Sequence, residues 1–225
     1  MSEGYLAVDI GTSSIKAVEK SADGAVLRWG ILERRNKPFH TGITRMDPAD
    51  VSKNLADLIA AMGATTRRAV ASVPAFLAIT VTAEAPDAKY VPASAGTFAF
   101  SSAQLGEKYF LAAIPNAVAE LYSAIFFKAG LLLESVTLES SAVAAHLGKA
   151  IELTLIVDIG DRSTTFTVAS EGVARYVAQT DFAVASSAPN VIMEKAKKIA
   201  ADFNISNTVS CGGEAGLPLC VAHGL

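Results

Sequence analysis

The chain has 225 residues, enough to bury one large hydrophobic core or two smaller ones. With 51% hydrophobic and 18% charged residues, its composition argues against intrinsic disorder. A formal net charge of −3 gives no general electrostatic basis for binding nucleic acid or an anionic membrane. The two cysteines, Cys211 and Cys220, lack the spacing of metal ligands, so neither a zinc site nor a disulfide framework is expected.

No part of the sequence has the pattern of a secretory leader or a membrane segment. The first residues lack a basic stretch followed by an apolar one, and no apolar run is long enough to cross a bilayer. We therefore expect a cytoplasmic protein, with any membrane association provided by a partner.

Residues 5–19 predict a strand, a tight polar turn and a second strand. Apolar residues alternate with small or polar ones up to Gly11, where the first strand ends, and apolar residues resume at Ile15. The turn between them holds one glycine and three hydroxyl residues. A glycine lets the backbone approach a ligand closely, and successive amides in such a turn can form an anion-binding concavity. We interpret this hairpin as a candidate phosphate-binding element; an ordinary hairpin with a hydroxyl-rich turn is the alternative.

The next residues predict one more strand, a helix and a fourth strand. Residues 25–32 read as a strand. Asp47 is a favourable N-cap, Pro48 suits the first helical position and Gly63 ends the helix. Residues 68–73 then predict a strand that is stopped by Pro74.

The middle of the chain predicts three strands and two helices. Residues 77–82 and 109–113 read as strands, and the proline-containing segment between them reads as irregular. A helix is expected to begin at Asn116. It should be followed by a strand over residues 133–138 and a helix over residues 140–147.

A second hairpin of the same kind is predicted over residues 153–168. There a strand again ends in Asp-Ile-Gly, passes through a polar turn and returns as a strand. Residues 173–179 predict a further strand and residues 189–203 a helix with an apolar stripe. A short strand from Thr208 then leads into a glycine-rich turn.

The order of the two Asp-Ile-Gly hairpins and the late Gly-Gly turn resembles the two phosphate motifs and the adenosine motif of the actin, hsp70 and sugar-kinase superfamily. Within it, VDIGTSSIKAVE, AVASVPAFLAIT, AGLLLESVTLESSAVA and LIVDIGDRSTTFTV are similar to segments of the PilM family of actin-like ATPases, which act in type IV pilus and type II secretion assembly and are related to FtsA. The resemblance implies an α/β, actin-like (ribonuclease H-like) fold of duplicated lobes with mixed sheets.

The resemblance also implies a division of the chain. Residues 1–74 and 131–148 would form the first lobe (1A), residues 75–130 a small inserted subdomain of the 1C type, and residues 149–225 a reduced second lobe (2A). About 30 residues separate Thr180 from the last Gly-Gly turn, which leaves room for one helix, so subdomain 2B is expected to be missing.

A nucleotide site between the two hairpins follows from the same resemblance, with ATP and Mg²⁺ as cofactors. Asp9 and Asp158 would hold Mg²⁺ through water and take part in catalysis. The residues expected to contact the phosphates are Gly11, Thr12, Ser13, Ser14 and Lys16 in the first hairpin and Gly160, Asp161, Ser163 and Thr164 in the second; Gly212, Gly213 and Glu214 would lie near adenosine. Turn stabilisation is the alternative role for the aspartates and hydroxyls, but the recurrence of the aspartates at matching places favours the nucleotide.

Actins carry a glutamine that orients the attacking water on the helix before the second hairpin. The corresponding position here is near Ser141, with no glutamine nearby, so Glu139 is the remaining catalytic candidate. We therefore expect at most a slow ATPase.

As a function, the resemblance implies a cytoplasmic scaffold that lies at the inner membrane through partners. Residues 76–79 and the helix after Asn116 would dock the N-terminal peptide of a PilN-like inner-membrane protein, with no nucleic acid and no direct membrane insertion. Assembly into a homo-oligomer stays open. The alternatives are a small-molecule (sugar-type) kinase, whose substrate lobe has little space here, and an actin-like interaction protein that binds no nucleotide.

Overall fold

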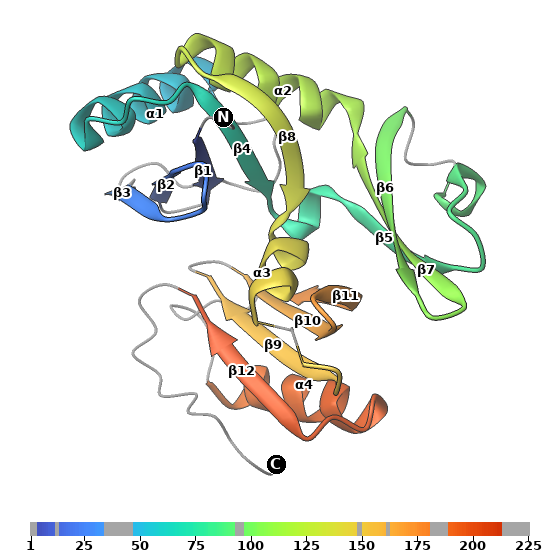
Figure 1. The fold of residues 1–225 in the computed structure, drawn as a ribbon. Coiled ribbons are helices and arrows are strands. Elements are labelled where there is room, and N and C mark those ends of the chain that lie inside the picture. Colours follow the sequence, from blue (N-terminus) through green and yellow to red (C-terminus); the bar gives the residue numbers. More distant parts are fainter. Residues whose placement is uncertain are drawn as a thin grey trace. The chain divides into compact units, whose positions relative to one another are not determined.

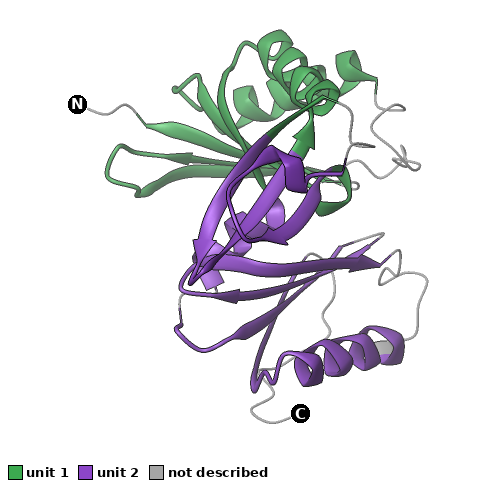
Figure 2. Ribbon diagram, turned by 90° about the vertical axis from the view of Figure 1, so that its right-hand side faces the viewer, with its two compact units in different colours: residues 1–77, 96–99, 114–138 green, residues 78–95, 100–113, 139–225 purple. Residues whose placement is uncertain are grey.

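The computed structural model describes residues 4–11, 14–33, 47–92, 97–147, 150–160, 163–180 and 189–212. The chain divides into two compact units (Figure 2). The first consists of residues 1–77, 96–99 and 114–138, and the second of residues 78–95, 100–113 and 139–225.

The first unit contains a mixed five-stranded sheet with the order β3-β2-β1-β4-β8 (Figure 1). Its strands are β1 (Tyr5–Ile10), β2 (Ser14–Lys20), β3 (Val26–Glu33), β4 (Arg68–Val73) and β8 (Leu132–Leu138). The first three strands pair antiparallel, while β4 runs parallel to β1 and β8 parallel to β4. Period-two alternation buries Leu6, Val8 and Ile10 on one face of this sheet, as the sequence predicted.

Helices α1 (Pro48–Met62) and α2 (Asn116–Lys128) contribute to one hydrophobic core with the buried residues of the sheet. The predicted cap of α1 is confirmed, because the Asp47 side chain accepts a hydrogen bond from the amide of Ala49 at 2.9 Å and Gly63 adopts φ 63°. The helix also approaches β3 closely. A Cβ atom at Gly30 would lie 2.8 Å from Leu58 Cδ1, so a larger residue there would displace side chains of α1.

Strand β3 is an edge strand of this sheet among the described residues. Because Gly30 faces α1, the odd-numbered residues of β3 face away from that helix. Leu27, Trp29 and Ile31 are accordingly exposed, Trp29 to 69% of its surface.

The second unit repeats the plan of the first. Its four-stranded sheet has the order β11-β10-β9-β12, which matches β3-β2-β1-β4. The strands are β9 (Thr154–Ile159), β10 (Thr164–Ser170), β11 (Val173–Thr180) and β12 (Asn207–Cys211). As in the first unit, the first three strands are antiparallel and the last runs parallel to the first.

Two helices cover this second sheet. Helix α4 (Pro189–Asp202) contributes Ile192, Ala196 and Ile199 to a core with one face, and α3 (Glu139–Leu147) contacts β9, β10 and β11 (Figure 1). All seven residues of β10 are buried as a result. The predicted duplicated fold with mixed sheets is confirmed.

A third sheet in the order β5-β7-β6 is formed by β5 (Ile79–Ala83), β6 (Phe98–Leu105) and β7 (Lys108–Pro115). Strand β6 corrects the expectation that the segment between the two predicted strands is irregular. Its run of polar residues after Phe100 leaves most of the strand exposed and hides the alternation. The predicted strand over residues 77–82 begins later, because residues Ala75–Leu77 form a 3₁₀ turn (η2) after Pro74; a second such turn (η3) spans Ala88–Tyr90. In the part of the chain that the structure describes, no helix has the length and apolar character needed to cross a membrane.

Candidate functional site

The two Asp-Ile-Gly hairpins close with the same hydrogen bond. The Gly11 amide donates to the carbonyl oxygen of Ser14 at 2.9 Å, and the Gly160 amide donates to that of Ser163 at 2.9 Å. In both hairpins the strand residue two before the glycine is an aspartate. The sequence repeat therefore extends to the hydrogen bonding of the turns, in which both glycine amides are engaged.

In the first hairpin, both carboxylate oxygens of Asp9 have partners. Ser72 Oγ donates to Asp9 Oδ1 at 2.9 Å, and Lys16 Nζ lies 3.3 Å from Asp9 Oδ2. The three residues are cross-strand neighbours on β4, β1 and β2, which places their side chains on the same face of the sheet. Lys16 is 45% exposed, so its ammonium group is accessible to an anion.

Sequence reasoning missed Ser72. In the sequence, Ser72 is only a small polar residue near the end of a strand predicted in the same lobe as β1. That pattern does not show that Ser72 contacts Asp9. The parallel register of β1 and β4, which pairs Asp9 with Ser72, was needed to bring the two together.

The second hairpin has the same strand pairing around its aspartate, but the paired residues are different. Asp158 pairs with Thr165 on β10 and with Cys211 on β12, so threonine stands where the first hairpin has Lys16 and cysteine where it has Ser72. Thr164 is fully buried, and Ser163, next to it, is partly exposed. Both hairpins therefore have the aspartate at the same position, but the residues that pair with it differ.

Glu139 is the first residue of α3 and belongs to the second unit, together with Asp158. Gly212 follows β12 directly, with φ 115°, and a Cβ atom there would lie 2.2 Å from the carbonyl oxygen of Ile159. This glycine therefore packs against the residue that precedes Gly160. Five of the expected nucleotide contacts lie outside the described residues: Thr12, Ser13, Asp161, Gly213 and Glu214.

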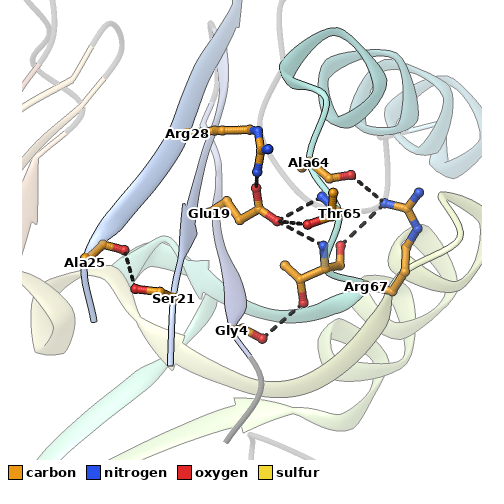
Figure 3. Close-up of polar contacts among 9 residues, drawn as sticks. Gly4, Glu19, Ser21, Ala25, Arg28, Ala64, Thr65 and Arg67 are labelled. Carbon is orange, nitrogen blue, oxygen red and sulfur yellow. Dashed lines mark hydrogen bonds and ion pairs between the residues drawn. The ribbon is translucent and has the colours of Figure 1, made fainter. Parts of the chain in front are cut away.

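A buried polar cluster lies on the face of the first sheet opposite to that of Asp9 (Figure 3). The carboxylate of Glu19, only 1% exposed, accepts hydrogen bonds from the amides of Thr65 and Thr66, each at 2.9 Å, and from the Thr65 hydroxyl at 3.1 Å. Arg28 Nη1 adds an ion pair at 2.5 Å. Residues from β2, β3 and the segment after α1 are thus joined through a single carboxylate.

Burial by itself raises the pKa of Glu19, because a charge is removed from water. The amides of Thr66 and Thr65, the Arg28 guanidinium and the Thr65 hydroxyl outweigh burial and lower the pKa to about 2. Glu19 therefore stays ionised at neutral pH and holds the sheet to the segment after α1. All of these partners belong to the chain itself. We therefore attribute this cluster to the stability of the fold.

The hairpin side chains suit a nucleotide with hydrated Mg²⁺ better than a directly bound metal. Among the described residues, no group of three or more histidine, cysteine, aspartate or glutamate side chains comes together as metal ligands would. Mg²⁺ usually keeps several waters and uses one or two carboxylates with substrate phosphates. Each hairpin supplies one aspartate, and in the first hairpin the accessible Lys16 lies beside it.

No family model matches the chain, and no curated protein matches it. Among solved structures, a chain of the PilM-PilN type IV pilus biogenesis complex is 18% identical, with a TM-score of 0.65; the match covers 89% of this chain and 66% of that one, slightly less than two thirds. The ethanolamine utilization protein EutJ from Carboxydothermus hydrogenoformans is 17% identical (TM-score 0.61; 96% and 79% covered). The cytoplasmic domain of EpsL, an inner-membrane component of the type II secretion system of Vibrio cholerae, is 12% identical (TM-score 0.53; 80% and 71% covered).

These similarities show the fold. The chain has an actin-like ATPase fold of reduced size, as its motifs predicted.

Proposed function

Because the chain has an actin-like fold in common with PilM and EpsL, we propose that it is a cytoplasmic scaffold of a pilus- or secretion-type assembly. It binds Mg-ATP through its two hairpins, docks a peptide from an inner-membrane partner and reaches the membrane only through that partner. Residues 75–130 act as an inserted 1C-type subdomain, and residues 149–225 as a second lobe without 2B.

The observation that carries this proposal is the arrangement of Asp9, Lys16 and Ser72 in the first hairpin. Ser72 and Lys16 hold the Asp9 carboxylate from two sides, at 2.9 Å and 3.3 Å. A carboxylate fixed in this way can accept hydrogen bonds from the waters of a hydrated Mg²⁺. Lys16, which is half exposed, can supply positive charge to phosphate oxygens.

The second hairpin contributes the other carboxylate of the proposed site. Asp158 stands in the same position relative to Gly160 as Asp9 does to Gly11, and both turns close in the same way. In this proposal Asp158 also binds the hydrated metal ion, with Ser163 beside the phosphates and Gly212 beside adenosine.

Peptide docking is proposed for residues 76–79 and helix α2. Phe76 is 49% exposed although it is aromatic, and Phe127 on α2 is also exposed. Exposed aromatic residues are frequent anchors of protein interfaces. The PilM-PilN complex supports a PilN-like partner for this chain.

The first test is titration of the purified full chain with Mg-ATP, followed by calorimetry and by the shift in melting temperature. We expect saturable binding that is lost in Asp9→Ala and in Asp158→Ala, while Asp57→Ala, which removes an exposed carboxylate on α1, binds as the wild type does. The absence of binding by the wild type at millimolar Mg-ATP would reject the nucleotide part of the proposal.

The peptide part is tested separately. A synthetic peptide with the N-terminal sequence of a PilN protein is titrated into wild-type chain, Phe76→Ser and Phe127→Ser. We expect both substitutions to weaken binding, with Phe100→Ser on β6 as the control for loss of an exposed phenylalanine. Equal binding by all four proteins would place the partner elsewhere.

A further inference from the structure

The outer edge of the first sheet is formed by β3, and the strand register shows which of its main-chain groups face outward. The turn amide of the first hairpin bonds to the Ser14 carbonyl oxygen, so Ser14 on β2 bonds toward β1. Residues of an antiparallel ladder bond alternately to one side and to the other, so Ala17 bonds toward β3, where it pairs with Gly30. The main chains of Trp29 and Ile31 therefore point away from β2, to a side where no strand pairs among the described residues.

The same edge exposes a row of apolar side chains. Trp29 and Ile31 are more than half exposed, and so are Val26 and Leu27 at the start of the strand. Natural proteins commonly protect an edge strand with charges, prolines or bulges, and a long apolar edge without them pairs readily with another chain. Between Trp29 and Ile31 none of these devices is present, because the bulge lies nearer the start of β3 and Arg28 is engaged by an ion pair on the other face.

The other edges of the two hairpin-bearing sheets differ. At the opposite edge of the first sheet, β8 exposes Leu132 at its start and then the polar residues Glu134, Ser135 and Thr137. In the second sheet β11 takes the position of β3, but only Tyr176 of its residues is exposed, and β12 is half-buried throughout. Among the described edges of these sheets, only β3 combines outward main-chain groups with an exposed apolar row.

Strand β3 is complementary to a second copy of itself. When two copies pair antiparallel about a two-fold axis at Gly30, Trp29 of one copy lies directly opposite Ile31 of the other, and the same pair forms again across the axis. These are the residues whose main chains point outward, so each pair can exchange both of its main-chain hydrogen bonds. A pair of an aromatic and a β-branched side chain is also among the stabilising cross-strand pairs.

The charges of β3 fit the same register. Arg28 comes to lie opposite Leu32 of the other copy and Glu33 opposite Leu27, so no two like charges face each other. Lys20 on β2 is on the same face as Glu33 of the other copy, two strands away. The separation of about 10 Å is one that a lysine and a glutamate can bridge together. The two-fold axis forms this contact twice, and a second copy therefore satisfies the edge in charge as well as in hydrogen bonding.

We propose that two copies of this chain associate through β3, which joins their first sheets into one. The four exposed apolar residues offer on the order of 450 Å² per copy, against about 800 Å² per partner in an interface of standard size. The dimer is therefore reversible, and its population depends on protein concentration. It uses none of the residues proposed to bind nucleotide or peptide, so it stands independently of the proposed function.

The test measures the mass of the purified full chain by sedimentation at increasing concentration, from about 1 μM to about 300 μM. We expect a monomer–dimer equilibrium that Ile31→Lys weakens at least tenfold, because it places a charge at the edge. The matched control is Ile151→Lys, which changes an exposed isoleucine outside β3 in the same way and should dimerise as the wild type does. Trp29→Lys is a second edge variant, and melting temperatures confirm that the variants are folded.

Amide exchange followed by NMR tests the pairing itself. At a concentration where the wild type is dimeric, the Trp29 amide should exchange at least fivefold more slowly in the wild type than in Ile31→Lys. The Gly30 amide, which bonds to β2, should exchange equally in both. A wild type that stays monomeric throughout, or a dimer that both edge variants leave intact, would overturn the proposal. Loss of the dimer without a change at the Trp29 amide would overturn strand pairing and indicate packing of the apolar side chains alone.

Discussion

Ser72 donates a hydrogen bond to Asp9 across the parallel strands β4 and β1, at 2.9 Å. Because the acceptor is a carboxylate, this bond orients the group that we propose to hold hydrated Mg²⁺. We expect Ser72→Ala to weaken Mg-ATP binding by three- to tenfold, which corresponds to about 1 kcal/mol for a partly exposed charged hydrogen bond. Calorimetry measures the change, and Ser135→Ala, an exposed serine on β8, is the control. If Ser72→Ala bound Mg-ATP with unchanged affinity, the hydrogen bond to Asp9 would not contribute to nucleotide binding.

Lys16 should matter more for ATP than for ADP. Its ammonium lies 3.3 Å from Asp9 and is 45% exposed, so it can turn to a terminal phosphate. Lys16→Met is expected to lose about tenfold in ATP affinity and less in ADP affinity, and to bind ATP with a weaker dependence on salt. Lys20→Met, at the other end of β2, should bind both nucleotides normally. Equal losses for ATP and ADP would contradict a contact with the terminal phosphate.

Glu19 should make the stability of the first unit depend on pH. Its pKa falls from an ordinary value of 4.5 to about 2 in the folded protein, so the fold favours the ionised form. The resulting stabilisation, roughly 3 kcal/mol, is complete above pH 4.5 and is lost as the pH falls from 4.5 toward 2. Urea unfolding at pH 7 and pH 3 should show a large deficit for Glu19→Gln at pH 7 and a smaller one at pH 3.

The control for Glu19 is an ion pair near the surface. Arg68 lowers the pKa of Glu134, but both side chains are about one-third exposed. Glu134→Gln should therefore change the free energy of unfolding far less than Glu19→Gln does at pH 7. If the deficit of Glu19→Gln were the same at pH 7 and pH 3, ionisation would not be the source of its contribution.

Gly212 should tolerate no side chain. A Cβ atom there meets the Ile159 carbonyl oxygen at 2.2 Å, and φ is 115°. Gly212→Ala is expected to lower the free energy of unfolding by more than about 2 kcal/mol, through the clash and the backbone strain together. Gly130→Ala, with φ 75° and open space around it, carries strain alone and should lose about 1 kcal/mol. Similar losses in the two variants would mean that β12 can move away from β9.

Local signals were sufficient to predict most elements of the fold. The N-cap of α1 and the Asp-Ile-Gly turns depend on residues that are neighbours in the sequence, so their patterns are visible there. Strand β6 was missed because its exposed residues give little alternation, and alternation appears only where one face of a strand is buried.

The partners of the candidate site could not be predicted in the same way. Ser72 is 63 positions from Asp9 in the chain, and Glu19 is 46 positions from Thr65. Which residues meet across β1 and β4, or which amides turn toward a carboxylate, is set by strand register and by the path of the chain after α1.

The exposed edge strand β3 supplies the protein with an intrinsic fluorophore. Trp29 is the single tryptophan of the chain, and it pairs with Val18, two residues from Lys16 on the same face of the first sheet. Its emission therefore originates in the first unit alone. Quenching or a wavelength shift on addition of nucleotide would follow events at the first hairpin in real time, in unlabelled protein, without interference from the second.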